Sequence, residues 1–253
     1  MKKVLYTVAV LAMAFTSLTS CESNSDDAPT ITDTSNILPV QVDVVNPDGE
    51  IEVVRFSYDG MKLIKTEFID GYRDYIYEDG LIIENNVYDA DGEVEILESY
   101  TYDAQGRVDT IVTDIANAST NTYALSYNED NSEITNSLIN DDDLYEDSIN
   151  TLRNGNMVKA DQGSSYITTY TYDNNKGFFQ NIEQREILVT IDSENNYPAQ
   201  FSLNNILSED RPTGFFKENA IYTYTYTDSN FPRTMTENRE GEITTYTFTY
   251  NND

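Results

Sequence analysis

The chain has 253 residues and a formal charge of −30, because 45 Asp and Glu outnumber 15 Lys and Arg and there is no His. So acidic a surface repels phosphate backbones and anionic headgroups, which excludes an unaided role in binding nucleic acid or charged lipid. The lack of His and the single Cys also exclude His-dependent triads, Cys–His dyads and zinc sites built from these residues.

The first residues are typical of a bacterial lipoprotein signal peptide. Lys2 and Lys3 precede an apolar run of 12 residues, Val4 to Phe15, which is too short to span a bilayer. The stretch Leu18 to Cys21 resembles the lipobox, whose Cys is lipidated and becomes the new N-terminus. The sequence predicts a signal peptide over residues 1–20 and a membrane anchor on Cys21. The alternative is an ordinary secretory signal with an incidental Cys.

Residues 21–38 are predicted to form a flexible tether. The segment after Cys21 is rich in Ser, Asp, Asn and Thr and offers little to bury. Within it, Ser25, Asp26 and Asp27 resemble the acidic export signal of surface lipoproteins in Bacteroidota. This resemblance implies an outer-membrane lipoprotein displayed on the cell surface. The alternative is an ordinary solvated linker.

Asp-Gly pairs follow at regular intervals. They recur after 11, 11, 9 and 12 residues, and the runs between them are dense in Val, Ile, Tyr and Thr. Asp and Gly tolerate the positive φ that both central residues of a type I′ turn require. The spacing therefore predicts consecutive antiparallel hairpins. The pairs are Asp48-Gly49, Asp59-Gly60, Asp70-Gly71, Asp79-Gly80 and Asp91-Gly92, with similar turn chemistry at Asn154-Gly155.

One hairpin allows a prediction of strand pairing. If Asp59-Gly60 forms a two-residue turn, Tyr58 pairs with Met61. The next pair on the same face is then Phe56 with Leu63, because side chains alternate along each strand. This face is apolar, as expected for a strand with one side in the core.

Later strands alternate aromatic residues with Thr at a period of two. The pattern is clearest in residues 166–172, 222–227 and 246–250. Both residue types suit a pleated, half-buried surface. About fifteen strands are predicted in all, too many for a flat open sheet. We therefore expect residues 39–253 to form one all-β domain, a long antiparallel meander curled into a barrel or half-barrel.

Residues 174–218 interrupt this pattern. They contain Phe178, Phe179 and Phe201 but no regular hairpin unit. Long irregular connections in compact domains are usually functional. We expect the aromatic side chains of this segment to fill the interior or to cap one end of the curled sheet.

The order of these motifs resembles a known family. Tyr100 to Val108, with sequence YTYDAQGRV, is similar to the YD repeat of large bacterial surface and toxin-shell proteins. The lipobox, the tandem Tyr-turn-Gly hairpins, the stretch Tyr172 to Phe179, the stretch Ser202 to Ile206 and the Tyr-rich end together resemble Bacteroidota lipoproteins of unknown function. The resemblance implies a porin-like fold. It brings no catalytic residues.

The densest acidic cluster is a weak candidate for Ca²⁺. Hard carboxylate oxygens are the ligands that Ca²⁺ prefers. The cluster lacks the D-x-D-x-D-G order of an EF-hand loop, so a solvated acidic turn is the favoured interpretation. Its members are Asp141, Asp142, Asp143, Glu146 and Asp147.

Neither a catalytic nor a cofactor site is predicted. A glycosidase needs two carboxylates about 5 to 10 Å apart, and among 45 acidic residues the sequence selects no pair. A transmembrane porin is disfavoured, because many strands carry Thr, Asp, Glu or Asn on the outer face, where lipid requires apolar side chains.

The sequence thus predicts a lipid-anchored, non-enzymatic β-sheet protein that binds or scaffolds a partner. The sequence does not identify the partner, which is either a protein or a glycan. The alternative is a glycan-binding component of a nutrient-uptake system, in which exposed Tyr rows stack on sugar rings. Tyr residues at strand period more often pack against cross-strand neighbours.

Overall fold

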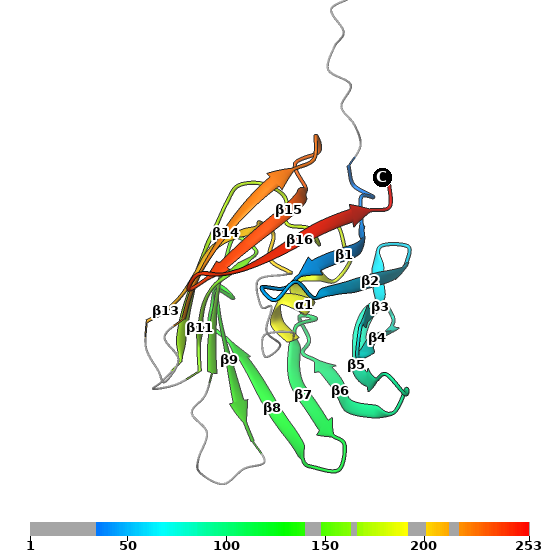
Figure 1. Cartoon of the computed structure of the whole chain (residues 1–253). Helices are drawn as coiled ribbons and strands as arrows, with labels where there is room; N and C mark the ends of the chain where they lie inside the picture. The colour runs from blue at the N-terminus through cyan, green and yellow to red at the C-terminus, as the bar shows by residue number, and fades with distance from the viewer. Residues whose placement is uncertain (1–33, 140–147, 163–165, 192–200, 213–217, 253) are drawn as a thin grey trace, which may run out of the picture. The chain divides into compact units, whose positions relative to one another are not determined.

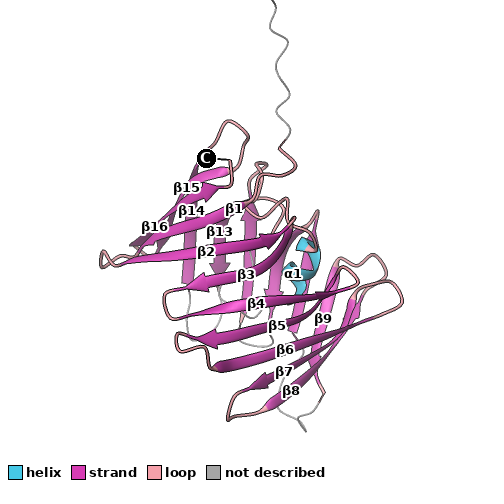
Figure 2. Ribbon diagram, turned by 90° about the vertical axis from the view of Figure 1, so that its right-hand side faces the viewer, coloured by secondary structure: helices cyan, strands magenta, loops and turns pink. Residues whose placement is uncertain are grey.

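The computed structural model describes residues 34–139, 148–162, 166–191, 201–212 and 218–252. All of them belong to one compact unit, Asp33–Asp253. Strands dominate it, and strands that follow one another in the chain are antiparallel neighbours (Figure 1 and Figure 2). The predicted all-β antiparallel meander is therefore confirmed.

The sheet closes on itself. β1 (Pro39–Val45) pairs with β16 (Glu242–Tyr250), so the described strands form a closed barrel of sixteen and not a half-barrel. The others are β2 (Ile51–Asp59), β3 (Lys62–Phe68), β4 (Gly71–Glu78), β5 (Leu81–Asp89), β6 (Val94–Tyr102), β7 (Val108–Ile115), β8 (Thr120–Tyr127), β9 (Glu133–Leu138), β10 (Ser148–Arg153), β11 (Asn156–Asp161), β12 (Ile167–Tyr172), β13 (Ile206–Arg211), β14 (Glu218–Tyr226) and β15 (Pro232–Arg239).

Two hairpin turns have the predicted type I′ geometry. Both central residues have positive φ, +50° and +86° in Asp79-Gly80 and +52° and +77° in Asn154-Gly155. Glu240-Gly241 has the same geometry, although Glu is not a typical left-handed residue. The pair Asp70-Gly71 is not a turn centre, because Gly71 begins β4 and pairs with Phe68.

The second hairpin corrects the predicted pairing. Tyr58 pairs with Leu63 and not with Met61, so the two turn residues are Gly60 and Met61. Positive φ occurs at the first of them alone, +63° at Gly60, as in a glycine-first type II′ turn. A β-bulge just before Tyr58 then shifts the register again. Phe56 therefore pairs with Thr66, and the predicted pair of Phe56 with Leu63 was wrong by the offsets of the turn and of the bulge together.

In residues 222–227 and 246–250 the aromatic and Thr side chains occupy opposite walls of the barrel, as the alternation predicted. Tyr222 and Tyr246 are buried in the core. The Thr residues between them form outward rows, in which Thr223, Thr236 and Thr245 are register partners on β14, β15 and β16. The Tyr rows of these two segments therefore pack inside the barrel.

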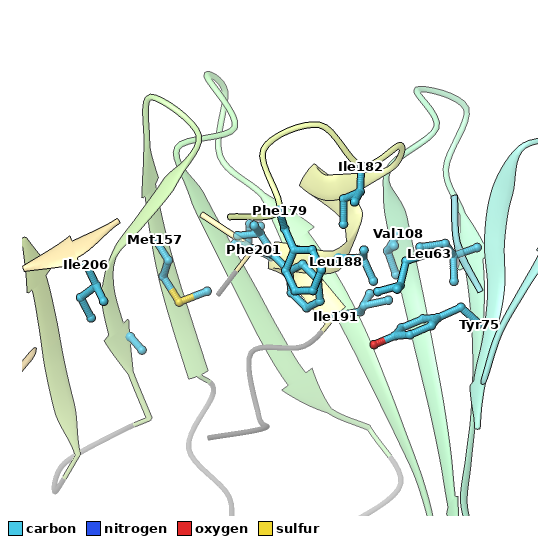
Figure 3. Packing of buried hydrophobic residues seen from close by; sticks show 14 of the residues in the cluster. Leu63, Tyr75, Val108, Met157, Phe179, Ile182, Leu188, Ile191, Phe201 and Ile206 are labelled. Atoms are coloured by element: carbon cyan, nitrogen blue, oxygen red, sulfur yellow. The ribbon is translucent and has the colours of Figure 1, made fainter. Parts of the chain in front are cut away.

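The described residues between β12 and β13, residues 173–191 and 201–205, lie inside the barrel and are called the plug; they include α1 (Arg185–Ile191) (Figure 1). Phe179 is fully buried and its ring lies 4.8 Å from that of Phe201 and 4.9 Å from that of Phe56 on β2. Figure 3 shows plug residues such as Leu188 among the inward side chains of the strands. The expectation that the aromatic side chains of this segment fill the interior is confirmed for Phe178, Phe179 and Phe201. β13 also lies within the predicted irregular range.

Hydrogen bonds fix the residues where the plug joins β12 and β13. The backbone N–H of Asp173 donates to the carbonyl of Asn205 at 3.0 Å, and the Asn205 N–H returns a bond of 3.1 Å to Oδ1 of Asp173. The hydroxyl of Tyr226 donates to the same carboxylate. Deeper in, Arg185 donates to the carbonyls of Gly155 at 3.1 Å and Phe201 at 2.8 Å. The plug is thus fastened to the strands at both ends and to a hairpin turn.

A set of tyrosines rings the end of the barrel that holds the plug. This is the plugged end, where β1 begins and β16 stops; the far end carries the turn between β15 and β16. Each of these tyrosines is the last or next-to-last residue of an even-numbered strand and donates its hydroxyl to a backbone carbonyl at the start of the preceding strand. We call the set the tyrosine collar: Tyr58 to Pro39, Tyr77 to Leu63, Tyr102 to Ile82, Tyr127 to Val108, Tyr172 to Met157 and Tyr250 to Pro232.

The collar links each hairpin to the next. Tyr58 pairs with Leu63, and the carbonyl of Leu63 accepts the hydroxyl of Tyr77. Tyr77 in turn pairs with Ile82, whose carbonyl accepts the hydroxyl of Tyr102. A β-bulge accompanies each of these pairs and turns a side chain inward where the strand ends. The recurring Tyr-turn motif of the sequence is therefore a structural repeat.

The folded unit begins before the predicted boundary at residue 39. Ile37 and Leu38 are buried. The side chain of Asn181, in the plug, donates to the carbonyls of Thr34 at 2.6 Å and Ile37 at 2.9 Å. Asn251 accepts a bond of 3.1 Å from the Leu38 N–H. The chain entering the barrel is therefore fixed to the plug and to the end of β16. In the described parts of the chain, helices long and apolar enough to cross a membrane are not found.

Candidate functional site

The outer wall of the barrel is polar. Arg55 on β2 pairs with Glu67 on β3, and Lys65 pairs with Asp74 on β4. The same face carries an ion pair of 3.1 Å between Lys65 and Glu67. Further round, Oγ1 of two Thr residues on β14 and β15 lie 2.7 Å apart. Exposed Ile, Val and Leu side chains occur between such groups. The outer face therefore offers water many hydrogen-bonding partners.

A charged network lies on the inner wall of β13 to β15. Glu209 is placed there because it pairs with Ala220, which is fully buried in the core. Arg239 joins two carboxylates: Nη2 donates to Glu209 at 3.0 Å and Nε to Glu237 at 2.8 Å. Arg211 adds an ion pair of 3.3 Å with Glu209. We call these four residues and Tyr222 the Glu209 network.

Tyrosine hydroxyls complete this network. The hydroxyl of Tyr222 donates to Glu209 at 3.2 Å, and that of Tyr246 donates to Glu237 at 2.9 Å. Burial raises the pKa of Tyr222, and the neighbouring charges of Glu237 and Glu209 raise it further. Burial alone lowers the pKa of Arg239, but its hydrogen bond and attraction to Glu209 outweigh burial and raise it. Tyr222 therefore stays neutral and the Arg239 guanidinium stays charged at ordinary pH.

A second polar group lies on the inner wall of β5 to β7. Asn85 is fully buried and pairs with Tyr75 of the core. Its Nδ2 donates to Oε2 of Glu98 at 3.1 Å. The hydroxyl of Tyr100 donates to the same oxygen at 2.8 Å, and Thr113 lies 3.4 Å from the other. We call these four residues the Asn85 cluster.

The residues predicted as sites from the sequence all lie outside the part of the chain that the structure describes. Cys21, the export residues Ser25, Asp26 and Asp27, and the acidic cluster from Asp141 to Asp147 lie outside the described residues. Groups of three or more His, Cys, Asp or Glu fit to hold a metal ion do not occur among residues 34–139, 148–162, 166–191, 201–212 and 218–252.

Sequence reasoning missed the inner charged residues. In β15, Glu237 and Arg239 occupy the same alternate positions as Met235, which packs against the core. In β13, Glu209 is likewise an inward residue. Charged residues in an alternating strand are usually assigned to the outer face. Because Glu237 and Arg239 alternate in step with the core residue Met235, the sequence alone could have placed them on the inner face.

The barrel resembles solved proteins from Bacteroides. A crystal structure of a porin-like protein from Bacteroides uniformis matches with a TM-score of 0.53 and 16% identity, over 84% of this chain and 97% of that chain. A porin-like protein from Bacteroides vulgatus gives a TM-score of 0.40 and 14% identity, over 83% and 97%. No family model matches the chain, and no curated protein does. The first likeness shows that the chain has the porin-like fold that the sequence resemblance implied.

Proposed function

We propose that this chain is a lipid-anchored protein of the outer membrane, displayed on the cell surface, which acts as a non-enzymatic binding or scaffolding module. The observation that carries the proposal is the paired charges on the outer wall of the barrel, set against an aromatic core in the plugged half of its interior. Membrane-spanning barrels are apolar outside and polar inside. Here the outer wall carries paired charges, whereas the plugged half of the interior is an aromatic core.

The outer wall fits water better than lipid. A Lys or Arg facing lipid at the middle of a bilayer costs about 2 to 4 kcal/mol. Arg55 and Lys65 stand within β2 and β3 on that wall, and Thr rows cover β14 to β16. A barrel of this kind reaches a membrane through an anchor, and the lipobox supplies one at Cys21. The porin-like fold is consistent with this location.

A binding role fits the inner polar residues better than catalysis. A glycosidase needs one carboxyl group that is free to protonate the leaving group. Glu209 and Glu237 are both hydrogen-bonded to Arg239, and each also accepts a tyrosine hydroxyl. Both carboxylates therefore serve as fixed acceptors.

The anchor is tested by Cys21→Ala in cells of a bacterium that processes lipoproteins. We expect the wild type to incorporate labelled palmitate and to sediment with outer membranes. The variant should lose the label and leave the membrane fraction. Sedimentation of an unlabelled wild type, with the variant still membrane-bound, contradicts the anchor.

Display is tested separately by replacing Asp26 and Asp27 with Ala. The double variant should keep the lipid label but resist external protease on intact cells. Equal digestion of wild type and variant would reduce these residues to a linker.

A further inference from the structure

Nine outward side chains on three neighbouring strands are all uncharged. They lie on β14, β15 and β16, in three rows of register partners (Figure 2). We call them the Thr panel: Ile221, Asn238 and Ile243 in the first row, Thr223, Thr236 and Thr245 in the second, and Thr225, Thr234 and Thr247 in the third. Charged residues begin at its borders, with Asp43 on β1, Asp210 on β13 and Arg233 in the bulge of β15.

The lack of charge in the Thr panel is unusual for this chain. Charged residues make up 24% of the sequence, and they make up about 25 to 35% of a typical protein surface. Nine surface positions would therefore hold about two or three charged residues, and the panel holds none. Depletion of charge marks the centre of protein–protein interfaces. The panel thus has the composition of an interface.

The Thr panel is open to a partner. Ile221 is 54% exposed and Ile243 is 43% exposed. The three hydroxyl groups of the second row have no hydrogen-bond partner among the described residues. A hydroxyl group both donates and accepts, so two identical rows of Thr can hydrogen-bond to each other. Oγ1 of Thr225 and Oγ1 of Thr234 already do so within the sheet, at 2.7 Å.

Charge favours a second copy of the chain as the partner. The chain carries −30, so two copies repel each other wherever their acidic surfaces meet. The Thr panel lets two copies touch without bringing like charges together. A basic protein would be drawn to the acidic surface around the panel instead. An oligosaccharide would find no aromatic ring to stack on, because Tyr222 and Tyr246 point into the core.

The closed sheet leaves a face as the means of association. The described strands form a closed barrel, so a second copy finds no free strand edge to extend. Two sheet faces pack at about 10 Å, with their side chains interdigitated. Rows of β-branched Thr and Ile suit such packing.

The size of the Thr panel predicts a weak dimer. Neighbouring strands lie about 4.8 Å apart and outward residues repeat about every 6.8 Å, so nine side chains cover about 15 Å by 20 Å. Two panels face to face would bury on the order of 600 Å², less than the about 1,200 to 2,000 Å² of stable interfaces. We therefore expect a transient dimer with a dissociation constant in the micromolar range or above.

We propose that the Thr panel is an interface between two copies of this chain, which meet face to face about a two-fold axis close to Thr236. Thr236 is the central residue of the panel, so an isologous contact centred on the panel places it opposite its own copy. A second copy is thereby named as one partner of the binding or scaffolding role proposed above, on which this inference rests.

The test is sedimentation equilibrium of purified residues 22–253. They keep the whole compact unit Asp33–Asp253 and omit the apolar run of residues 4–15, which would associate by itself. We expect monomer and dimer in equilibrium. The dimer should strengthen as salt is raised from about 0.1 to 1 M, because the Debye length falls from about 10 to 3 Å and screens the repulsion between the acidic chains.

Charge at the centre of the panel should break the dimer. Thr236→Glu brings two carboxylates together at the axis and should weaken association about ten-fold or more. Thr169→Glu is the matched control, because Thr169 is an exposed Thr of β12 that pairs with Lys159 and Asp210 outside the panel. This variant should dimerise like the wild type. An equal mixture of Thr236→Glu and Thr236→Lys should restore the dimer, since opposite charges then meet at the axis.

Urea midpoints are measured for every variant. They should stay near that of the wild type, so that lost association cannot be attributed to unfolding. Four results overturn the proposal: a wild type that stays monomeric in all conditions, a dimer that salt weakens, equal weakening by Thr169→Glu and Thr236→Glu, or a mixture that stays monomeric.

A glycan partner would also overturn the proposal. Its sign would be a monomeric wild type that binds maltoheptaose in calorimetry, with the binding lost in Thr236→Glu. Sedimentation in solution requires neither lipid nor export, so none of these results changes the outcome of the anchor and display experiments.

Discussion

The hydroxyl of Tyr77 donates a hydrogen bond of 2.9 Å to the backbone carbonyl of Leu63, a residue that is fully buried 14 positions earlier. The bond replaces water at a carbonyl where a β-bulge has displaced the regular ladder. The other five tyrosines of the collar make equivalent hydrogen bonds at the plugged end.

Tyr77→Phe should lower the free energy of unfolding by about 1 to 2 kcal/mol, because it leaves the Leu63 carbonyl buried without a donor. Urea denaturation measures the change. Tyr72→Phe on the outer wall is the control, and its midpoint should stay near that of the wild type. Equal midpoints for both variants would show that the collar bond contributes nothing to stability.

Alkaline pH should unfold the barrel. Burial raises the pKa of Tyr102 to about 12, and burial also raises that of Tyr127 to about 12. Unfolded tyrosine titrates near pH 10. The folded state therefore binds protons that the unfolded state releases, so the stability from these tyrosines is complete below about pH 10 and is lost as pH rises toward about 12.

Circular dichroism and tyrosinate absorbance, followed together, check this prediction. The tyrosinate signal of the collar should rise with the loss of strand signal. A collar that titrates near pH 10 while the barrel stays folded contradicts it.

Gly71→Ala should be strongly destabilising. A Cβ at this position lies 2.0 Å from the backbone oxygen of Tyr88 on the neighbouring strand, so β4 and β5 would have to separate. A loss above about 3 kcal/mol is expected. Gly49→Ala is the control: its φ is +88° but its Cβ meets open space, so only about 1 kcal/mol should be lost. Equal losses would mean that the two strands separate easily at Gly71.

Arg185→Met should loosen the plug. The guanidinium is buried and serves the carbonyls of Gly155 and Phe201, and burial lowers its pKa. Losing these bonds should cost about 2 to 4 kcal/mol. Glu186→Gln removes only the exposed partner of a 3.4 Å ion pair and should cost less than about 0.5 kcal/mol. Hydrogen exchange of the α1 amides measures both, and unchanged protection in Arg185→Met would refute the role of this side chain.

Local patterns predicted much of this fold. The turn at Asp79-Gly80 and the alternation of Tyr222 with Thr223 follow from backbone conformation and burial, which act between near neighbours in the sequence. The turn at Gly60-Met61 was misplaced because its register depends on the bulge that directs Tyr58 toward Pro39. That contact spans 19 residues, and no local motif encodes it.

The inner polar groups were missed for a related reason. Whether Glu209 faces in or out depends on its pairing with Ala220 and on Arg239, which is 30 residues away. Each residue taken alone is an ordinary surface residue. Parity with Met235 places Glu237 and Arg239 on the inner face, but only the pairing of β13, β14 and β15 brings Arg239 to Glu209.

The pairing of the first strand with the last sets the order of folding. Val42 on β1 faces Phe248 on β16, so this seam cannot form until nearly the whole chain has been delivered. Contacts between such distant residues slow folding, because the chain between them must lose conformational entropy before the contacts can stabilise the fold. Until then β1 and β16 each have one edge whose backbone N–H and C=O groups lack partners, and such edges favour aggregation. The seam thus acts as a check on completeness: a chain that lost β16 would keep most of its hairpins yet expose β1 and β15 together.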